Sequence, residues 1–331
     1  MNAPAAPAAT RLLAENVAVT FSVTGEGLFS RRVAVRAVDG VSFGVAAGEV
    51  VALVGESGCG KTSLARAIAG LTAPAAGRVV LDGLDVTGFP ASLPQDARAA
   101  VQMVFQDPFE SLNPRKTVLA TLIQPLRLNR NVAPEGRRAE AARLMRLVGL
   151  PEEALERYPH EFSGGQRQRI GIARAIAPGP RLLIADEAVS ALDISIRAQL
   201  LALLRSLKDA LDLSLLFITH DLGVVRSFAD RVLVMYLGRI VEEGPTAAVF
   251  EQPRHPYTRA LLAATPIPDP VAARAARREI LGGDVPSPRA IPAGCRFHPR
   301  CPVAIARCAV EAPVHRTTSA QAAVSCHLAV G

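Results

Sequence analysis

The chain has 331 residues, half of them hydrophobic, and this length is sufficient for a large core in two or three structural units. No run of about 18 uncharged apolar residues occurs, so the sequence predicts no membrane-spanning helix. The net charge of +7 would suit nucleic acid, but the basic residues are scattered, and we expect no nucleic-acid partner. Residues 1–9 lack the basic and apolar regions of an export signal, and we expect them to be a disordered tail of a cytosolic protein.

Residues 50–70 carry the first motif. The apolar run Val50–Val54 predicts a buried strand, and the residues after it match the pattern G-x-x-x-x-G-K-[ST] in full, before a predicted helix over residues 63–70. In such a loop the backbone N–H groups and the helix N-terminus hold phosphates, Lys61 reaches the β- and γ-phosphates, and Thr62 ligates Mg²⁺. A chance glycine turn before a helix is the alternative. The predicted ATP-binding residues of the loop are Gly55, Glu56, Ser57, Gly58, Cys59, Gly60, Lys61, Thr62 and Ser63.

A second helix start with free N–H groups is predicted at residue 163. The helix runs to Ile176, Ser163 is its N-cap, and Pro178 stops it. The positive end of this helix can bind a second phosphate group, which suggests that the two anion sites share one kind of ligand. The residues of this segment are Ser163, Gly164, Gly165 and Gln166.

Residues 181–187 form an apolar strand that ends in two carboxylates. This is the pattern of a Walker-B element, in which Asp186 holds Mg²⁺ through water and Glu187 is the general base for the attacking water. Taken alone, the pattern is also compatible with a solvated strand end.

The run Ser-Gly-Gly-Gln-Arg-Gln-Arg at residues 163–169, just before that strand, resembles the signature motif of the ABC ATPase family. The resemblance implies an α/β fold: a RecA-like P-loop core with an antiparallel β-subdomain at its start and an α-helical subdomain at residues 107–178, within a nucleotide-binding domain over residues 10–254. Phe162 stands where the family commonly has Leu, and Ala188-Val189 where it has Pro-Thr. Neither change removes a reactive group.

The same resemblance implies further site residues. Gln106 matches the glutamine that contacts Mg²⁺ and the attacking water, and His220, after the apolar strand over residues 215–219, matches the histidine that contacts the γ-phosphate. Phe29 is the nearest ring for an adenine platform, although Phe21 competes with it and a core role is equally open. The residues that match the D-loop are Ser190, Ala191, Leu192 and Asp193.

Residues 255–331 resemble the C-terminal extension of the oligopeptide/dipeptide/nickel importer ATPases, through residues 255–262, 294–297 and 300–302. The segment from Gln106 to Pro114 favours the second of the two paralogous ATPases in such systems. The resemblance implies ATP and Mg²⁺ as ligands and a head-to-tail dimer, in which each ATP lies between one chain's P-loop and the other chain's signature helix.

The expected partners of such an ATPase are a paralogous ATPase subunit, two transmembrane permease subunits and, indirectly, an extracytoplasmic solute-binding protein. The expected place is the cytoplasmic face of the cell membrane, and the expected cargo is a di- or oligopeptide. Glutathione, nickel or sugar cargo stays open. A soluble ABC ATPase that acts on ribosomes or nucleic acid is the alternative function, although the chain has a single cassette and no sustained heptads.

Four of the five cysteines lie in the C-terminal tail, residues 295–331. This tail is short and rich in proline, and we expect it to have weak potential to form a hydrophobic core of its own. The reducing cytosol disfavours the two disulfides that four cysteines could form. The spacing C-x₅-C-x₆-C-x₁₇-C also lacks the close C-x₂-C pairs that are usual for zinc sites. We therefore expect a [4Fe–4S] cluster, which the subfamily resemblance also implies, with zinc or free buried thiols as alternatives. The predicted ligands are Cys295, Cys301, Cys308 and Cys326.

Overall fold

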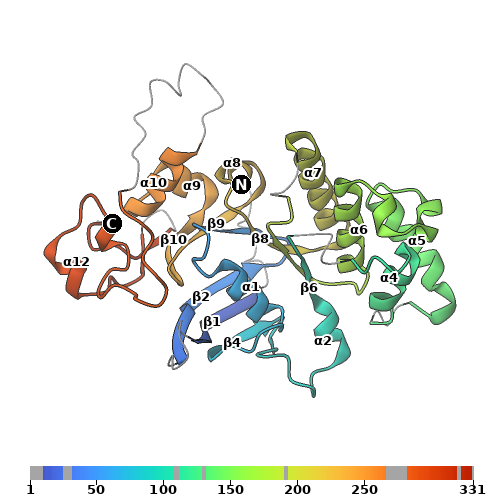
Figure 1. Ribbon diagram of the computed structural model, residues 1–331, viewed down its shortest axis with the longest axis horizontal. Helices are drawn as coiled ribbons and strands as arrows, with labels where there is room; N and C mark the ends of the chain where they lie inside the picture. Colours follow the sequence, from blue (N-terminus) through green and yellow to red (C-terminus); the bar gives the residue numbers. More distant parts are fainter. Residues whose placement is uncertain are drawn as a thin grey trace, which may run out of the picture.

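The computed structural model describes residues 10–24, 32–106, 112–128, 132–189, 193–265, 282–318 and 322–329. These residues form two β-sheets, and helices gather around the larger one (Figure 1). The α/β class predicted from the sequence is confirmed.

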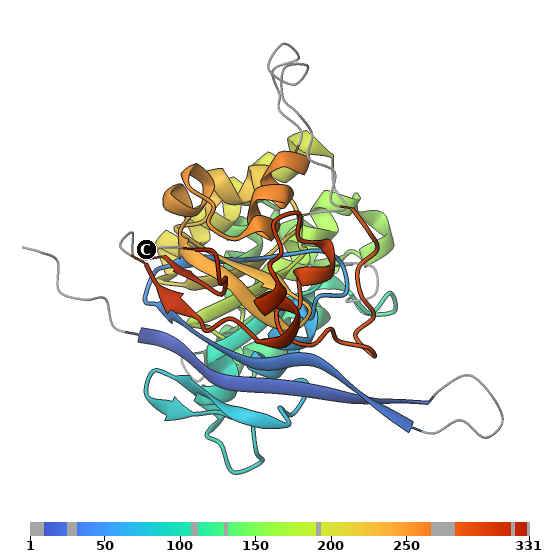
Figure 2. The same cartoon turned by 90° about the vertical axis from the view of Figure 1, so that its left-hand side faces the viewer.

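The smaller sheet is antiparallel, with the strand order β2-β1-β4-β5. The two long strands pair from Thr10 opposite Ala46 to Thr24 opposite Arg32, and Figure 2 shows them crossing the base of the molecule. This sheet is the antiparallel β-subdomain that the sequence predicts. Its strands are β1 (Thr10–Thr24), β2 (Arg32–Ala46), β4 (Ala76–Leu81) and β5 (Leu84–Asp85).

The larger sheet has the strand order β11-β12-β10-β9-β3-β8-β7-β6. Strands β9, β3, β8, β7 and β6 pair in parallel, and β3, β7 and β8 are buried along their whole length. Burial on both faces explains why these strands are continuous apolar runs in the sequence. The strands are β3 (Val50–Val54), β6 (Val101–Val104), β7 (Leu182–Asp186), β8 (Ser214–Ile218), β9 (Arg231–Tyr236), β10 (Arg239–Pro245), β11 (Arg316–Thr317) and β12 (Ala323–Val324).

Figure 1 shows where the helices lie relative to the two sheets. Helices α4, α5 and α6 lie together at one end, within the predicted helical subdomain, while α1 lies beside the smaller sheet. None of the described helices has both the length and the apolar character needed to cross a bilayer. The α-helices are α1 (Lys61–Ile68), α2 (Gln95–Ala100), α4 (Val118–Leu126), α5 (Arg137–Leu147), α6 (Gly164–Ile176), α7 (Ile194–Leu211), α8 (Leu222–Phe228), α9 (Thr246–Glu251), α10 (Pro256–Ala264) and α12 (Ala306–Val310). The 3₁₀ turns are η1 (Pro134–Gly136), η2 (Glu152–Glu156), η3 (Pro159–Glu161) and η4 (His298–Arg300).

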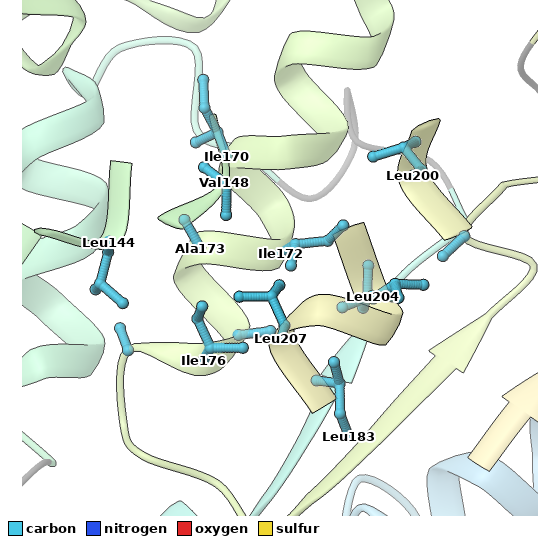
Figure 3. Close-up of a cluster of buried hydrophobic side chains, with 14 of the residues drawn as sticks. Leu144, Val148, Ile170, Ile172, Ala173, Ile176, Leu183, Leu200, Leu204 and Leu207 are labelled. Carbon is cyan, nitrogen blue, oxygen red and sulfur yellow. The ribbon is translucent and has the colours of Figure 1, made fainter. Parts of the chain in front are cut away.

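Helix α6 joins the helical group to the central sheet. Its apolar side chains lie between α5 and α7 in Figure 3, and residues of all three helices belong to one buried cluster. Ile172 is only 1% exposed in this cluster. The body of α6, from Ile170 to Ile176, is therefore held by core packing on both sides of the helix.

The C-terminal tail packs against the core instead of standing apart from it. Strand β12 pairs with β10, so the tail adds two strands to the central sheet. Phe297 is 1% exposed and its ring lies 5.3 Å from Tyr236 and 5.4 Å from Tyr257, between ring centroids. The expectation of weak core potential was wrong for this part of the tail, because Phe297, Cys308 and Val324 are all buried.

Truncation of Ile172 tests the packing of α6. We predict that Ile172→Ala lowers the free energy of unfolding by about 2–5 kcal/mol, because it leaves a cavity in a fully packed region. Chemical denaturation of the full chain measures the change. Val310→Ala is the control, since Val310 is 80% exposed, and equal losses in both variants would contradict the packing described here.

Candidate active site

The loop between β3 and α1 has a backbone conformation that only glycine adopts easily. Gly55, Gly58 and Gly60 have φ angles of +152°, +77° and +108°. A Cβ on Gly60 would lie 2.1 Å from the backbone oxygen of Ala37, and one on Gly55 would lie 2.2 Å from that of Met235. Neighbouring strands thus leave the loop no room for side chains at these two positions.

Lys61 is the first residue of α1 and is only 6% exposed. Its ammonium donates hydrogen bonds to the carbonyl oxygens of Gly55 (2.8 Å) and Glu56 (2.9 Å), and so lies across the loop. The loop N–H groups, the helix N-terminus and this buried cation together form an anion site. The helix begins at Lys61, slightly before the predicted start, because the left-handed Gly60 ends the loop.

Cys59 and its neighbours in the loop differ in exposure. Cys59 is buried, burial raises the pKa of its thiol, and its sulfur lies 3.7 Å from the Lys61 ammonium. Ser57 and Gly58 are exposed at the tip of the loop, and Ser63 is half-buried in α1.

Thr62 and Asp186 supply two oxygen ligands suited to Mg²⁺. The Thr62 hydroxyl lies 3.3 Å from a carboxylate oxygen of Asp186, which is the last residue of β7. Burial raises the pKa of Asp186, and the hydrogen bond from Thr62 opposes that rise. Hydroxyl and carboxylate oxygens are the ligands that Mg²⁺ prefers. The structure brings these two predicted metal ligands together although they are far apart in the sequence.

Glu187 and His220 lie at the same edge of the sheet. The Glu187 N–H donates to the carbonyl oxygen of Ile218 (3.0 Å), and the residue takes the left-handed conformation, with φ at +47°. Its carboxylate lies 3.5 Å from Nδ1 of His220, whose side chain is 61% exposed. A carboxylate and an exposed imidazole next to the anion site can exchange a proton with a water molecule there.

Gln106 lies beyond the end of β6 with its side chain exposed. Val104 pairs with Ala185, so Gln106 leaves the sheet at the level of Glu187. Its backbone position is therefore at the same edge as the two carboxylates.

The signature segment has the predicted helix cap. The Ser163 hydroxyl accepts a hydrogen bond from the N–H of Gln166 (3.4 Å), and the Gln166 side-chain oxygen accepts one from the N–H of Ser163 (3.0 Å). Gly165 is buried, and a Cβ there would lie 2.8 Å from Ile196 of α7. In Figure 1, α6 lies with α4 and α5 at one end, apart from α1 beside the smaller sheet.

Four predicted residues, Phe29, Ser190, Ala191 and Leu192, lie outside the described residues. Asp193 is exposed and is the N-cap of α7, without a hydrogen bond from its side chain to the helix.

The four tail cysteines lie near one another. Cys295 donates its N–H to the carbonyl oxygen of Cys308 (2.8 Å). Burial raises the pKa of the Cys295 thiol, and the nearby thiols of the other three cysteines raise it further. Within the described ranges, however, no three His, Cys, Asp or Glu side chains are arranged to hold a metal ion.

Comparison with known proteins decides the family. The family described as ABC transporter matches residues 38–190, and the one described as the oligopeptide/dipeptide transporter C-terminal region matches residues 241–308. A probable peptide ABC transporter ATP-binding protein of Sinorhizobium fredii is 51% identical, over 89% of this chain and 83% of its own. The di/tripeptide transport ATP-binding protein DppF of Pseudomonas aeruginosa is 48% identical, over 91% of this chain and 92% of its own.

The chain belongs to the ABC transporter family of ATP-binding proteins. Among solved structures, a dimeric ATP-binding cassette in a post-hydrolysis state with ADP and Pi is 28% identical, with a TM-score of 0.60, over 71% of this chain and 98% of that one. The RecA-like P-loop core predicted from the sequence is confirmed, and the chain is an ATP-hydrolysing enzyme.

Sequence reasoning missed two contacts to the phosphate loop of this ABC ATPase. Tyr257 and Arg300, both from the C-terminal third of the chain, bind Glu56. Both residues lie in segments that carry the resemblance to the importer ATPases, residues 255–262 and 300–302, but nothing in the sequence pairs them with Glu56.

Substitution of Gly60 tests the geometry of the loop. We predict that Gly60→Ala weakens ATP binding by at least about tenfold, or about 1.4 kcal/mol, because the added carbon must displace packed backbone. Gly58→Ala is the matched control. The φ of Gly58 is also positive, but a Cβ there meets nothing within 4 Å, so only the backbone strain of a left-handed alanine opposes this substitution. Equilibrium ATP binding to both variants measures the difference, and equal affinities would contradict the contact with Ala37.

Proposed function

We propose that this chain energises an ABC importer of di- or oligopeptides. The observation that carries the proposal is the presence, in one chain, of an ATP site and of a tail that matches the oligopeptide/dipeptide transporter C-terminal region. The relatives named above are peptide or di/tripeptide transport proteins and are aligned over most of this chain. In this proposal the nucleotide-binding domain spans residues 10–254, the helical subdomain residues 107–178 and the extension residues 255–331.

The proposed roles follow from the positions around the phosphate loop. The loop and Lys61 hold the ATP phosphates. Glu187 accepts the proton of the attacking water as the new bond to the γ-phosphorus forms and the bond to the ADP oxygen breaks, and His220 contacts the γ-phosphate. Thr62, Gln106 and Asp186 would hold Mg²⁺, which would neutralise charge on the β- and γ-phosphates.

The proposed assembly is a head-to-tail dimer with a paralogous ATPase. Its support is that α1, which follows the phosphate loop, and α6, which begins with the signature segment, lie apart in Figure 1, so that the signature segment of a partner would complete the site. The other proposed partners are two transmembrane permease subunits and, acting through them, an extracytoplasmic solute-binding protein. The ATPases attach to the permease at the cytoplasmic face of the membrane. No nucleic-acid partner is proposed.

Reconstitution of the complex tests this function. The chain is coexpressed with the adjacent membrane and ATPase subunits and purified in detergent, and ATP-dependent uptake of a labelled dipeptide is measured in liposomes. We predict that the complex copurifies and transports the dipeptide. Glu187→Gln is expected to keep ATP bound but to lower turnover about 10²–10⁴-fold, because the general base is lost.

Lys116→Gln is the matched control, since Lys116 is an exposed residue that bonds only Gln124 among its described side-chain contacts. Association with ribosomes in place of the membrane subunits would contradict the transport function. Wild-type turnover in Glu187→Gln would contradict the role of the base.

We also propose that the tail thiols hold a [4Fe–4S] cluster. The support is the donor set, four cysteines in one small segment whose thiols raise the pKa of Cys295 beyond the effect of its burial. Bound there, a cluster would cross-link β12 and the turn at residues 298–300 through their neighbouring cysteines.

Metal analysis tests the cluster. An anaerobic preparation is predicted to be brown and to contain about four iron atoms per chain. Cys308→Ser is expected to lose both colour and iron, whereas Cys59→Ser, the control outside the tail, keeps them. A colourless wild-type protein, with zinc or without metal, would contradict the proposal.

A further inference from the structure

Glu56, the second residue of the phosphate loop, is held by two residues from the C-terminal third of the chain. Its N–H donates to the hydroxyl oxygen of Tyr257 (2.9 Å). Its carboxylate accepts two hydrogen bonds from Arg300, from Nη1 (2.7 Å) and from Nη2 (3.0 Å). Backbone and side chain of one loop residue are thus both fixed from outside the loop.

The pair of Arg300 and Glu56 is largely removed from water. The Arg300 side chain is 6% exposed and that of Glu56 is 26% exposed, and Arg300 lies over the ring of Tyr236 with its Cζ 6.0 Å from the centroid. A two-pronged hydrogen bond between a guanidinium and a carboxylate is directional as well as strong. The loop carboxylate therefore has one preferred position.

The contact between Glu56 and Tyr257 is also held in place by neighbouring residues. Tyr257 is fully buried and is the second residue of α10, where its own N–H donates to Nδ1 of His255 (3.0 Å). Burial lowers the pKa of His255 to about 3, so its ring is neutral and accepts this bond at physiological pH. The Tyr257 hydroxyl is thereby held in place below the loop.

The position of Glu56 determines that of the phosphate-binding groups. Its carbonyl oxygen accepts from the Lys61 ammonium (2.9 Å) and from the N–H of Cys59 (3.3 Å). A shift of Glu56 would therefore move the Lys61 ammonium and the N–H of Cys59. Without a cation beside it, the Glu56 carboxylate would also repel the phosphates that the loop binds.

We propose that Arg300 is a positioning residue for ATP binding, which fixes the phosphate loop through Glu56 and so makes ATP affinity depend on the C-terminal tail. Arg300 ends the turn η4, which follows the buried Phe297 and directly precedes Cys301, so the tail places the guanidinium through a short segment. The proposal concerns ATP binding alone and stands whether or not the cargo is a peptide.

Equilibrium ATP binding to the full chain tests this role. Arg300→Met keeps an apolar stem and removes the charge, and we expect it to weaken ATP binding about tenfold, or 1.4 kcal/mol, within the range of a hydrogen bond to a charged group. The matched control is Arg307→Met, which breaks another two-pronged pair in the tail, with Glu311 (2.7 and 2.6 Å), but does so at the exposed surface. The control is expected to bind ATP like the wild type.

Two further variants separate positioning from general stability. In a Glu56→Ala background, Arg300→Met is expected to have no further effect on ATP affinity, because its route to the loop is gone. Arg300→Lys keeps the charge but not the two-pronged geometry, and a loss smaller than that of Arg300→Met is expected. This variant also decides the matter if Arg300→Met does not fold.

The role is overturned by any one of three results. The first is wild-type ATP affinity in Arg300→Met, or in Arg300→Lys where only that variant folds, even with a lowered melting temperature. The second is an equal loss of affinity in the Arg300 and Arg307 variants. The third is an undiminished effect of Arg300→Met in the Glu56→Ala background.

Discussion

The parallel pairing of β8 between β3 and β7 is the constraint on which the ATP site depends. Phe217 pairs with Ala52 on one side and with Ala185 on the other, so three distant segments run in one register. Their carboxyl ends then meet at one edge of the sheet, where the phosphate loop, Asp186 and His220 follow. A slip of one residue would turn the buried side chains of a strand to its other face, which core packing on both faces opposes.

Two buried charged residues of opposite sign, Asp186 and Lys61, lie at this edge of the sheet. Asp186 is buried, so ionisation of its carboxyl is unfavourable unless cations are near. Lys61 is also buried and lies at the start of a helix, where the backbone already favours anions. Nucleotide phosphates with a divalent cation would suit this arrangement, because they would bring both signs of charge into the same small volume.

The tail is an integral part of this ABC ATPase. Strand β12 extends the central sheet, and Phe297 packs between two tyrosines of the core. Arg300 follows Phe297 by one turn and reaches the phosphate loop. A segment that would be read as an appendage thus supplies both a sheet edge and a contact to the nucleotide site. Two of its cysteines, Cys295 and Cys301, flank the same turn, so they share a short piece of backbone with Arg300.

The sequence by itself determined the elements whose signals are local. The glycine pattern before Lys61, the apolar run before Asp186 and the cap at Ser163 each depend on neighbours within a few residues, and each was predictable for that reason. Only the tertiary structure decided which distant residues meet. The pairing of β12 with β10 and the contact of Arg300 with Glu56 join positions far apart in the chain. Such contacts arise from the packing of whole elements, and no spacing in one sequence encodes them.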